Sequence, residues 1–326
     1  MSFLAIINPA AGGGRCRQLV GPALERLRAA GIAIEPIETN AAGEATKIAR
    51  EAYARGYRKF LAVGGDGTSY EIVNGLFPES RSQVTGDRSQ DSGDRSKVSG
   101  VRSQDSHAAA ETIPTLGFLP LGTGNSFLRD FSDQGVEHAI DALLARRSQP
   151  CDVLRLTHKE GVIYFINLLS VGFAADVNIL RHRRFQGWGH AGYWISILLS
   201  LARLKRRPFP VRTDGQGEFD RRPCLFLSFN NSKFTGGTMM IAPQASTDDG
   251  LIDFVRWGPI GRLGLIRNLG GLYDGTHVNH RLAETRKTQC IEFQLEGPID
   301  VMVDGEALTL HCQQIEVLPA ALRVVV

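Results

Sequence analysis

The chain has 326 residues, of which 43% are hydrophobic and 22% are charged, and its formal net charge is +3 at pH 7. This length exceeds what one ordinary hydrophobic core requires, so we expect two domains. The small net charge argues against a globally basic nucleic-acid-binding protein, and we expect no nucleic-acid partner.

The first 150 residues alternate short apolar runs with helical patterns. Helices are predicted at Arg15–Ala30 and Gly43–Arg55, each followed by a glycine suited to end it. Pro22 is expected to kink or restart the first helix. Four apolar runs predict strands, at Phe3–Ile7, Ile32–Ile37, Phe60–Val63 and Leu116–Leu121. This alternation predicts an α/β domain over residues 1–150 with a doubly wound parallel sheet, which binds ligands beyond the carboxyl ends of its strands.

Residues 79–112 interrupt this pattern. Arg-Ser recurs at positions 81, 88, 95 and 102 in a background of Ser, Gln, Asp and Gly, without aromatic residues, leucine or isoleucine at heptad positions. Such a composition buries too little apolar surface to order itself. We therefore predict a disordered surface insertion, with a phosphorylatable serine tract as the less favoured alternative.

After residue 150 the alternation of predicted strands and helices gives way to successive predicted strands. Val153–Leu156 and Val162–Leu169 predict a hairpin, and helices are expected at about 177–204 and 260–273. Further apolar runs separated by Gly, Asp and Pro predict strands, at Cys224–Phe229, Leu251–Trp257, Ile291–Leu295, Ile299–Val303 and Leu322–Val326. Residues 151–326 are therefore expected to form an antiparallel β-sandwich domain.

The cellular compartment is predicted from three further features. The apolar start Met1–Pro9 has neither a basic leader nor a cleavage site, which favours a strand over a signal peptide. No apolar stretch reaches the ~20 residues of a spanning helix. The five cysteines are scattered, odd in number and without a C-x-x-C pair, as expected for buried reduced thiols. We expect a cytoplasmic protein that contacts membranes only as a peripheral protein.

The densest motif is Gly64-Gly65-Asp66-Gly67-Thr68, directly after the strand Phe60–Val63. Glycines at the carboxyl end of a strand let the backbone approach a phosphate, and the start of the next helix offers unpaired N–H groups. Thr68 and Glu71 have the spacing of a capping box for that helix. A phosphate-binding loop is therefore favoured over a bare tight turn.

Two more small-residue loops follow other predicted strands. The loop at 8–15 follows the first strand and lacks the G-K-[S/T] of a Walker A motif, and the loop at 120–125 follows the fourth strand. Each loop alone is weak support. Three such loops at one edge of a parallel sheet would suit a nucleotide.

The strings INPAAGGGR, GGDGTSYEIVNG, LPLGTGN and VDGE resemble, in order and spacing, the diacylglycerol kinase catalytic-domain family, which includes bacterial lipid kinases, sphingosine kinases and ceramide kinases. The resemblance covers nearly the whole chain apart from 79–112. It implies an ATP-dependent lipid kinase with an α/β domain, a β-sandwich domain and ATP in the cleft between them. By this resemblance, ATP contacts fall on Asn8, Pro9, Ala10, Ala11, Gly12, Thr39, Gly65, Asp66, Gly67, Thr68, Ser69, Tyr70, Glu71 and Thr123.

Phosphoryl transfer needs a base that accepts the proton of the alcohol. Asp66 matches the base of the sphingosine kinase branch, and Glu306 matches the proton acceptor of bacterial diacylglycerol kinases. Outside that context, Asp304-Gly305 between two apolar runs would be an ordinary hairpin turn. The resemblance leaves the role divided between Asp66 and Glu306.

The resemblance also implies magnesium, bridging the ATP phosphates and keeping most of its waters. In some bacterial members a D-G-x-x-D segment holds a structural magnesium ion. On that match Asp249 offers its carboxylate, and Ser246 and Leu251 offer carbonyls. A solvated turn before a strand is an equally good interpretation.

A basic segment is expected to meet the lipid. No acidic residue occurs between Val177 and Arg212, whereas eight Lys or Arg flank an apolar helical stretch with Trp194. This pattern suits transient contact with an anionic membrane surface, and a core helix with a basic end is the alternative. By resemblance to sphingosine kinases, Arg183 and Arg184 could alternatively contact ATP phosphates.

The lipid itself stays open between diacylglycerol and a sphingosine-like long-chain base. Ser126 stands where many bacterial members have Asp, which argues against diacylglycerol. Asp176 resembles the sphingosine kinase residue that contacts the head group, and a helix cap is its alternative role. His277 and His280 are interpreted as surface histidines.

Other classes of function are weighed against the lipid kinase. An NAD kinase or a phosphofructokinase would share only the G-G-D-G loop. A non-catalytic nucleotide- or lipid-binding module would be favoured by loss of Asp66 or Glu306, and both are present. The sequence also leaves open whether the chain is a monomer or a homodimer.

Overall fold

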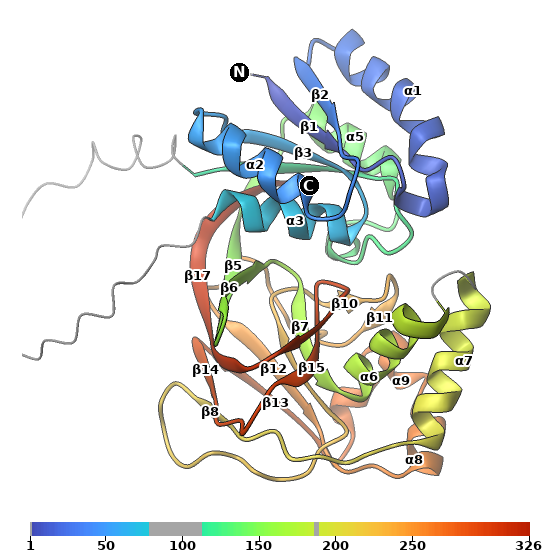
Figure 1. Ribbon diagram of the computed structural model, residues 1–326, viewed down its shortest axis with the longest axis vertical. Helices are drawn as coiled ribbons and strands as arrows, with labels where there is room; N and C mark the ends of the chain where they lie inside the picture. The colour runs from blue at the N-terminus through green and yellow to red at the C-terminus, as the bar shows by residue number, and fades with distance from the viewer. Residues whose placement is uncertain (1, 78–112, 186–188) are drawn as a thin grey trace, which may run out of the picture.

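The structure is a computed structural model whose described residues are 2–77, 113–185 and 189–326 (Figure 1). The insertion predicted at 79–112 lies outside them. No helix among the described residues is both long and apolar enough to cross a membrane. All five cysteines are unpaired, and four of them are buried.

The first domain is built on a parallel sheet with strand order β2–β1–β3–β4. Its strands are β1 (Phe3–Ile7), β2 (Ile34–Glu38), β3 (Lys59–Gly64) and β4 (Thr115–Pro120). The helices α1 (Arg15–Ala29) and α5 (Val136–Leu144) cover one face, and α2 (Glu44–Ala54) and α3 (Asp66–Leu76) cover the other (Figure 1). The α/β prediction is confirmed.

Helix α1 runs through Pro22 without interruption, so the predicted restart is wrong. Pro22 lacks the N–H that would bond to the preceding turn. Buried Ala23, Leu24 and Leu27 follow it and pack against the sheet. Because tertiary packing supplies most helix stability in proteins, the helix continues despite the missing hydrogen bond.

The second domain is an antiparallel β-sandwich, as predicted. One layer is a six-stranded sheet in the order β13 (Ala283–Thr288), β12 (Ile252–Trp257), β9 (Phe226–Asn230), β7 (Leu168–Gly172), β15 (Ile299–Val303) and β16 (Glu306–Leu310). The other contains β5 (Ser148–His158), β6 (Gly161–Phe165), β8 (Val211–Thr213), β14 (Cys290–Phe293) and β17 (Cys312–Val325). Apolar side chains from both layers, such as Leu156, Phe229 and Ile291, form the core between them.

Helices cover one side of the sandwich. They are α6 (Phe173–Leu180), a π-helical turn at Arg181–Phe185, α7 (Gly189–Ala202), α8 (Arg262–Arg267) and α9 (Gly271–Asp274). Both predicted helical regions therefore contain helices. A short hairpin of β10 (Phe234–Thr235) and β11 (Met239–Met240) faces the first domain.

The last strand joins the two domains. The end of β17 pairs in parallel with β4, through Arg323 opposite Thr115. Earlier in the same strand, Ile315 lies opposite Ile291 of β14, and β5 follows β17 along most of its length. The first sheet therefore continues into the second domain through one long ribbon (Figure 1).

Candidate functional site

Three glycine-containing loops meet at the carboxyl edge of the parallel sheet: the first at 8–15, the second at 64–68 and the third at 120–125. The Gly122 N–H donates to the Gly64 carbonyl at 2.8 Å. A Cβ atom on Gly122 would lie 2.5 Å from the Gly65 Cα, and one on Gly12 would lie 2.6 Å from the Leu121 carbonyl oxygen. Only glycine permits these approaches, so the sequence prediction that the loops share one edge is confirmed.

Two threonines lie at the base of these loops. Thr39, directly after β2, donates its N–H to the Ile7 carbonyl at 2.8 Å, which places it beside the first loop. The hydroxyl of Thr68 lies against Gly64, is buried, and has no hydrogen-bond partner among the described residues. A buried hydroxyl without a partner calls for a ligand or a water molecule.

The predicted capping box between Thr68 and Glu71 is wrong. Helix α3 begins at Asp66 after Gly65 and has no side-chain cap. The Glu71 carboxylate instead accepts the N–H groups of Gly43 at 2.8 Å and of Ala45 at 3.1 Å, at the start of α2. Unpaired N–H groups and the helix dipole at that end both favour a carboxylate.

Asp66 lies in the first turn of α3, between the second and third loops. Its carboxylate accepts the Ser126 N–H at 2.9 Å, and a Cβ atom on Gly124 would lie 2.8 Å from its Oδ2. Burial raises the pKa of Asp66, and hydrogen bonds from Ser126 and from the Phe127 N–H oppose that effect. A carboxylate in this environment is a stronger base than an exposed one.

Asp304 and Gly305 form the turn of the β15–β16 hairpin, with φ of 46° and 92°. The Asp304 side chain is buried and accepts N–H groups from Ile166 and Leu168 at 3.0 and 2.9 Å. Burial raises the pKa of Asp304 to about 7, and the negative charge of Asp66 adds to the increase. The D-G turn is thus a hairpin turn and also part of an acidic site.

Glu306 follows this turn and reaches the glycine loop. A Cβ atom on Gly67 would lie 2.7 Å from the Glu306 Oε1, so glycine at that position lets the carboxylate approach. Burial raises the pKa of Tyr70, and so do the charges of Asp304 and Glu306. Glu306 therefore lies beside Gly67, the residue that follows the other candidate base, Asp66, in the glycine loop.

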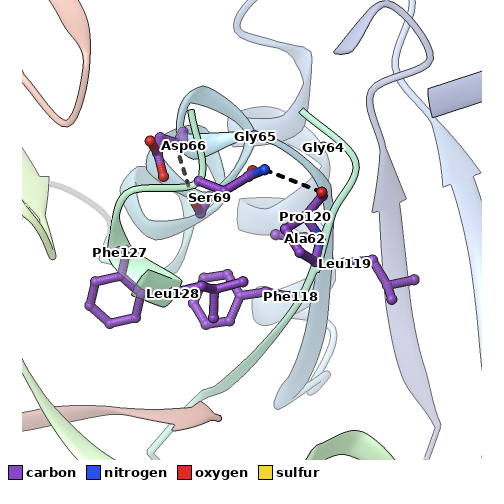
Figure 2. A pocket seen from close by; sticks show the side chains of 11 residues that line it. Ala62, Gly64, Gly65, Asp66, Ser69, Phe118, Leu119, Pro120, Phe127 and Leu128 are labelled. Atoms are coloured by element: carbon purple, nitrogen blue, oxygen red, sulfur yellow. Dashed lines mark hydrogen bonds between the residues drawn. The ribbon is translucent and has the colours of Figure 1, made fainter. Parts of the chain in front are cut away.

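A small pocket lies behind Asp66, between the second and third loops. Its apolar lining includes Phe118, Phe127 and Leu128, with Asp66 on the other side of the pocket (Figure 2), and Asn125 also lines it. The rings of Phe118 and Phe127 are 5.4 Å apart. Asn125 has φ of 49° and donates to the carbonyls of Pro120 and Gly122, which holds the third loop in shape.

The remaining predicted nucleotide contacts fall into two groups. Asn8, Pro9, Ala10 and Ala11 form the first loop, where the Asn8 side chain accepts the Ala10 N–H at 3.1 Å, and Thr123 is exposed in the third loop. Tyr70 instead packs against the core of the second domain, and the Ser69 hydroxyl donates to the Asp66 carbonyl. The structure brings the first group to the loop edge, whereas the Tyr70 side chain packs against the second domain near Glu306.

The second domain closes against the third loop through backbone contacts. The Ser126 hydroxyl accepts the Gly237 N–H at 2.9 Å, and the Asp130 carboxylate accepts the Lys233 N–H at 3.1 Å. Burial raises the pKa of Asp130 to about 6. On the other side, the Asn74 amide pairs with the backbone N–H and carbonyl of Tyr164. These contacts fix α3 and the third loop relative to the sandwich.

The predicted structural magnesium site contains a lysine. The Lys287 ammonium lies 2.5 Å from the Asp249 carboxylate and 3.2 Å from Asp253, and it also donates to the Gln244 carbonyl. The other Asp249 oxygen accepts the Leu251 N–H at 3.0 Å, and the Ser246 hydroxyl donates to Asp248.

This donor set does not fit a magnesium ion. Its one predicted carboxylate is already paired with an ammonium group. The predicted site at Ser246, Asp249 and Leu251 is therefore corrected to a lysine-centred ion-pair cluster.

Asp176 is paired with an arginine. Its carboxylate oxygens lie 2.6 and 2.8 Å from one Arg207 nitrogen, and the helix cap of α6 is Gly172 without a side-chain hydrogen bond. The alternative of a capping role is therefore wrong. Two residues on, Asn178 donates to the Gly305 carbonyl at 2.9 Å, so α6 adjoins the acidic hairpin.

The interpretation of both histidines as surface residues is wrong for His277. It is 2% exposed, its Nδ1 lies 3.0 Å from the Gly271 carbonyl, and its ring packs against Trp257. The side chain of Arg183 lies outside the described part of the structure, whereas Arg184 is exposed.

Three residues of this region were missed by sequence reasoning. Asp304 was noticed only as a turn residue, although an Asp-Gly turn two residues before a candidate base was a usable signal. The sequence carries no local signal for Asp130 or Lys287. Their partners, Lys233 and Asp249, lie 103 and 38 residues away in the chain.

Comparison with known proteins gives matches over nearly the whole chain. Residues 2–156 match the diacylglycerol kinase catalytic domain, and residues 167–326 match the YegS C-terminal NAD kinase beta sandwich-like domain. A diacylglycerol kinase of Mycobacterium tuberculosis is 27% identical over 323 residues, which is 98% of this chain and 93% of that protein. A probable lipid kinase YegS-like protein of Xanthomonas oryzae is 28% identical, over 92% of this chain and 89% of its own.

A solved structure has the same fold. The crystal structure of a putative diacylglycerol kinase from Bacillus anthracis superposes with a TM-score of 0.72, covering 99% of this chain and 94% of that one. The sequence identity between the two is 24%, so this likeness concerns the fold alone.

Proposed function

The chain belongs to the diacylglycerol kinase catalytic-domain family and is a lipid kinase, and from this premise we propose that it transfers the γ-phosphate of ATP to the hydroxyl of a neutral lipid of the diacylglycerol class. The observation that carries the proposal is the meeting of the three glycine loops with Asp66 and Glu306. The loops offer backbone N–H groups at one edge, and the two acids lie directly beside them.

In the proposed reaction, the lipid hydroxyl oxygen attacks the γ-phosphorus and the bond to the β–γ bridging oxygen breaks. ADP leaves, and the hydroxyl proton passes to a carboxylate of the Asp66 and Glu306 pair. The raised pKa of Asp66 supports this role, because a base works best when its pKa is near the operating pH. The Ser126 N–H holds the Asp66 carboxylate in position.

Magnesium fits this acidic edge better than the Lys287 cluster. One carboxylate of the Asp66 and Glu306 pair would hold it and leave the other as the base, because Mg²⁺ needs only one or two protein carboxylates and keeps several waters. When bound with ATP, the ion would neutralise part of the negative charge of the phosphates. Burial is the main cause of the raised pKa of Asp304, and the smaller contribution from the negative charge of Asp66 is one that such a cation would relieve.

The pairing of Asp176 favours a neutral lipid over a long-chain base. An ammonium head group would need an unpaired carboxylate, whereas both Asp176 oxygens contact Arg207. A diacylglycerol hydroxyl carries no charge and does not require an unpaired carboxylate. The name of the Mycobacterium tuberculosis relative supports the same substrate class.

The test is transfer of labelled phosphate from ATP to a panel of lipids in detergent micelles, with diacylglycerol, a long-chain base, ceramide and NAD as acceptors. We expect label on diacylglycerol. Asp66→Asn and Glu306→Gln should each lower kcat by about 10²–10⁴-fold, the usual contribution of a general base. The matched controls Asp133→Asn and Glu25→Gln change exposed side chains away from the loops and should keep full activity.

Each other outcome decides against part of the proposal. Label on NAD alone would replace the lipid kinase by an NAD kinase. Label on a long-chain base alone would support the alternative in which Asp176 recognises the head group of the substrate. ATP binding by calorimetry without transfer to any acceptor would favour a non-catalytic binding module.

A further inference from the structure

The outer side of the second domain exposes large apolar side chains. Leu198 on α7 is 62% exposed, and Leu263 and Ile266 on α8 are 73% and 54% exposed. These are the three highest exposures among the large apolar side chains of the described residues. Together with the basic residues named below, they form what we call the α7–α8 face.

The two helices are joined at this face. The Arg262 guanidinium donates to the carbonyls of Leu201 at 3.1 Å and Ala202 at 2.7 Å, at the C-terminal end of α7. Leu198 is one turn earlier, about 5 Å along the axis. Figure 1 shows α8 next to that end of α7, on the outer side of the sandwich. The three exposed side chains therefore come from neighbouring turns of the surface.

These apolar residues are separate from the core that holds the helices. Ile197 and Leu201 of α7 pack with buried Leu265 of α8 against Trp257. Leu263 and Ile266 are three residues apart, so they share one side of α8. Because the inward side chains already anchor both helices, the outward ones are not needed for packing within the described fold.

Positive charge surrounds the apolar side chains. Neither 189–213 nor 258–273 contains an acidic residue. Five exposed basic residues lie in these segments, and none of them forms an ion pair within the described part of the chain: Arg203, Lys205, Arg206, Arg262 and Arg267. Exposed leucine and isoleucine among arginine and lysine residues without acidic partners are the composition of an interfacial membrane-binding surface.

We propose that the α7–α8 face docks the enzyme on an anionic lipid bilayer. Leu198, Leu263 and Ile266 enter the boundary between head groups and acyl chains, and the basic side chains contact lipid phosphates. The inference rests on the proposed function, which requires the enzyme to reach a lipid. Charge complementarity selects a bilayer, because anionic lipids present phosphate everywhere on their surface, without the matched shape that a protein partner needs.

The helical layer connects this face to the acidic site. Helix α6 packs against α7, and Asn178 of α6 donates to the Gly305 carbonyl, next to Glu306. A bilayer held on the α7–α8 face therefore lies on the side of the sandwich from which α6 leads to the two candidate bases.

The test is co-sedimentation of the full chain with phosphatidylcholine vesicles that contain or lack 30% phosphatidylglycerol. We expect binding to the anionic vesicles that weakens as salt is raised. The double variant Leu263→Ser, Ile266→Ser should lower the partition coefficient at least about tenfold, because it removes two inserting side chains. Arg203→Gln with Lys205→Gln should lower it on anionic vesicles only. The matched control Leu19→Ser alters a 49% exposed leucine on α1 and should change nothing.

Activity on lipid in detergent micelles separates this proposal from the proposed function. The α8 double variant should keep its micellar activity and its melting temperature while losing activity on vesicles. Equal binding of the double variant and the native chain would overturn the membrane role of this face. So would a change of oligomeric state in sedimentation equilibrium with vesicle binding intact, which would identify the face as a contact between copies. Absence of micellar activity in the native chain would refute the kinase proposal and leave the vesicle result standing.

Discussion

Ser126 bridges Asp66 and the second domain. Its N–H donates to the Asp66 carboxylate at 2.9 Å, and its hydroxyl accepts the Gly237 N–H at the same distance. One residue of the third loop thus links a candidate base in the first domain to the β10–β11 hairpin of the second. The position of Asp66 therefore depends on the closure of the two domains.

The first prediction concerns Ser126→Ala. The Gly237 N–H loses its acceptor, which should lower the free energy of unfolding by about 1–3 kcal/mol. Asp66 keeps the Ser126 N–H but loses the hydrogen bond from the Ser126 hydroxyl, which favours its ionised form, so its pKa should rise. The acid limb of the pH–rate profile should then move to higher pH. Ser132→Ala is the control, since that hydroxyl also accepts a backbone N–H, from Gln134, at an exposed position. An unchanged pH profile would separate Ser126 from the chemistry.

The second prediction tests the glycine contacts between loops. In Gly122→Ala, the new Cβ atom would meet the Gly65 backbone, so the loops must separate. We expect weaker ATP binding in calorimetry, by tenfold or more, and a loss of stability of about 1–3 kcal/mol. Gly21→Ala, in α1 with open space around it, should instead raise stability by about 0.5–1 kcal/mol. Full ATP affinity in Gly122→Ala would show that loop contact is unnecessary.

The third prediction is a pH dependence of stability. The pKa of Asp304 is about 7 in the folded chain, above the ordinary value of 3.8, so the folded state binds this proton more tightly. Its stabilising contribution is complete below pH 3.8 and is lost as pH rises through 7. Urea unfolding between pH 4 and 8 should therefore show a decrease with pH that Asp304→Asn reduces. Asparagine tolerates the φ of 46° at this position.

The control for this measurement is Asp300→Asn, an aspartate of the same strand that accepts the Thr309 hydroxyl at an exposed position. It should leave the slope unchanged. An identical slope in the native chain and Asp304→Asn would mean that Asp304 ionises normally when buried.

The fourth prediction concerns the lysine-centred cluster. Removing divalent cations with a chelator should not shift the melting temperature of the native chain, because Lys287 already neutralises Asp249 and Asp253. Lys287→Met should lower the free energy of unfolding by on the order of 1–2 kcal/mol, since the pair is only partly buried. Lys47→Met, on the exposed side of α2, is the control. A chelator-dependent melting temperature that Asp249→Asn abolishes would restore the predicted metal site, whereas one that Asp66→Asn abolishes would come from the acidic edge.

The sequence by itself determined the two-domain α/β and β-sandwich fold and the three loops. Strands β1, β3 and β4 lie within one residue of their predicted bounds, because short continuous apolar runs and the turn residues that follow them are local signals. Parallel strands then require their carboxyl ends to lie at one edge, so the meeting of the loops follows from the strand order. The acids of the D-G-T and D-G-E motifs were identified by the resemblance of these short motifs to those of the family.

The tertiary structure alone decided what those acids contact and how they ionise. Glu71 fits a capping box by its spacing, yet it binds the start of α2. Asp249 fits a metal ligand by its motif, yet Lys287 reaches it from a neighbouring strand. The physical reason is that a charged side chain is stabilised by the nearest partner in space and destabilised by burial. Both are set by chain segments far away in sequence, as they are for Ser126 and Gly237.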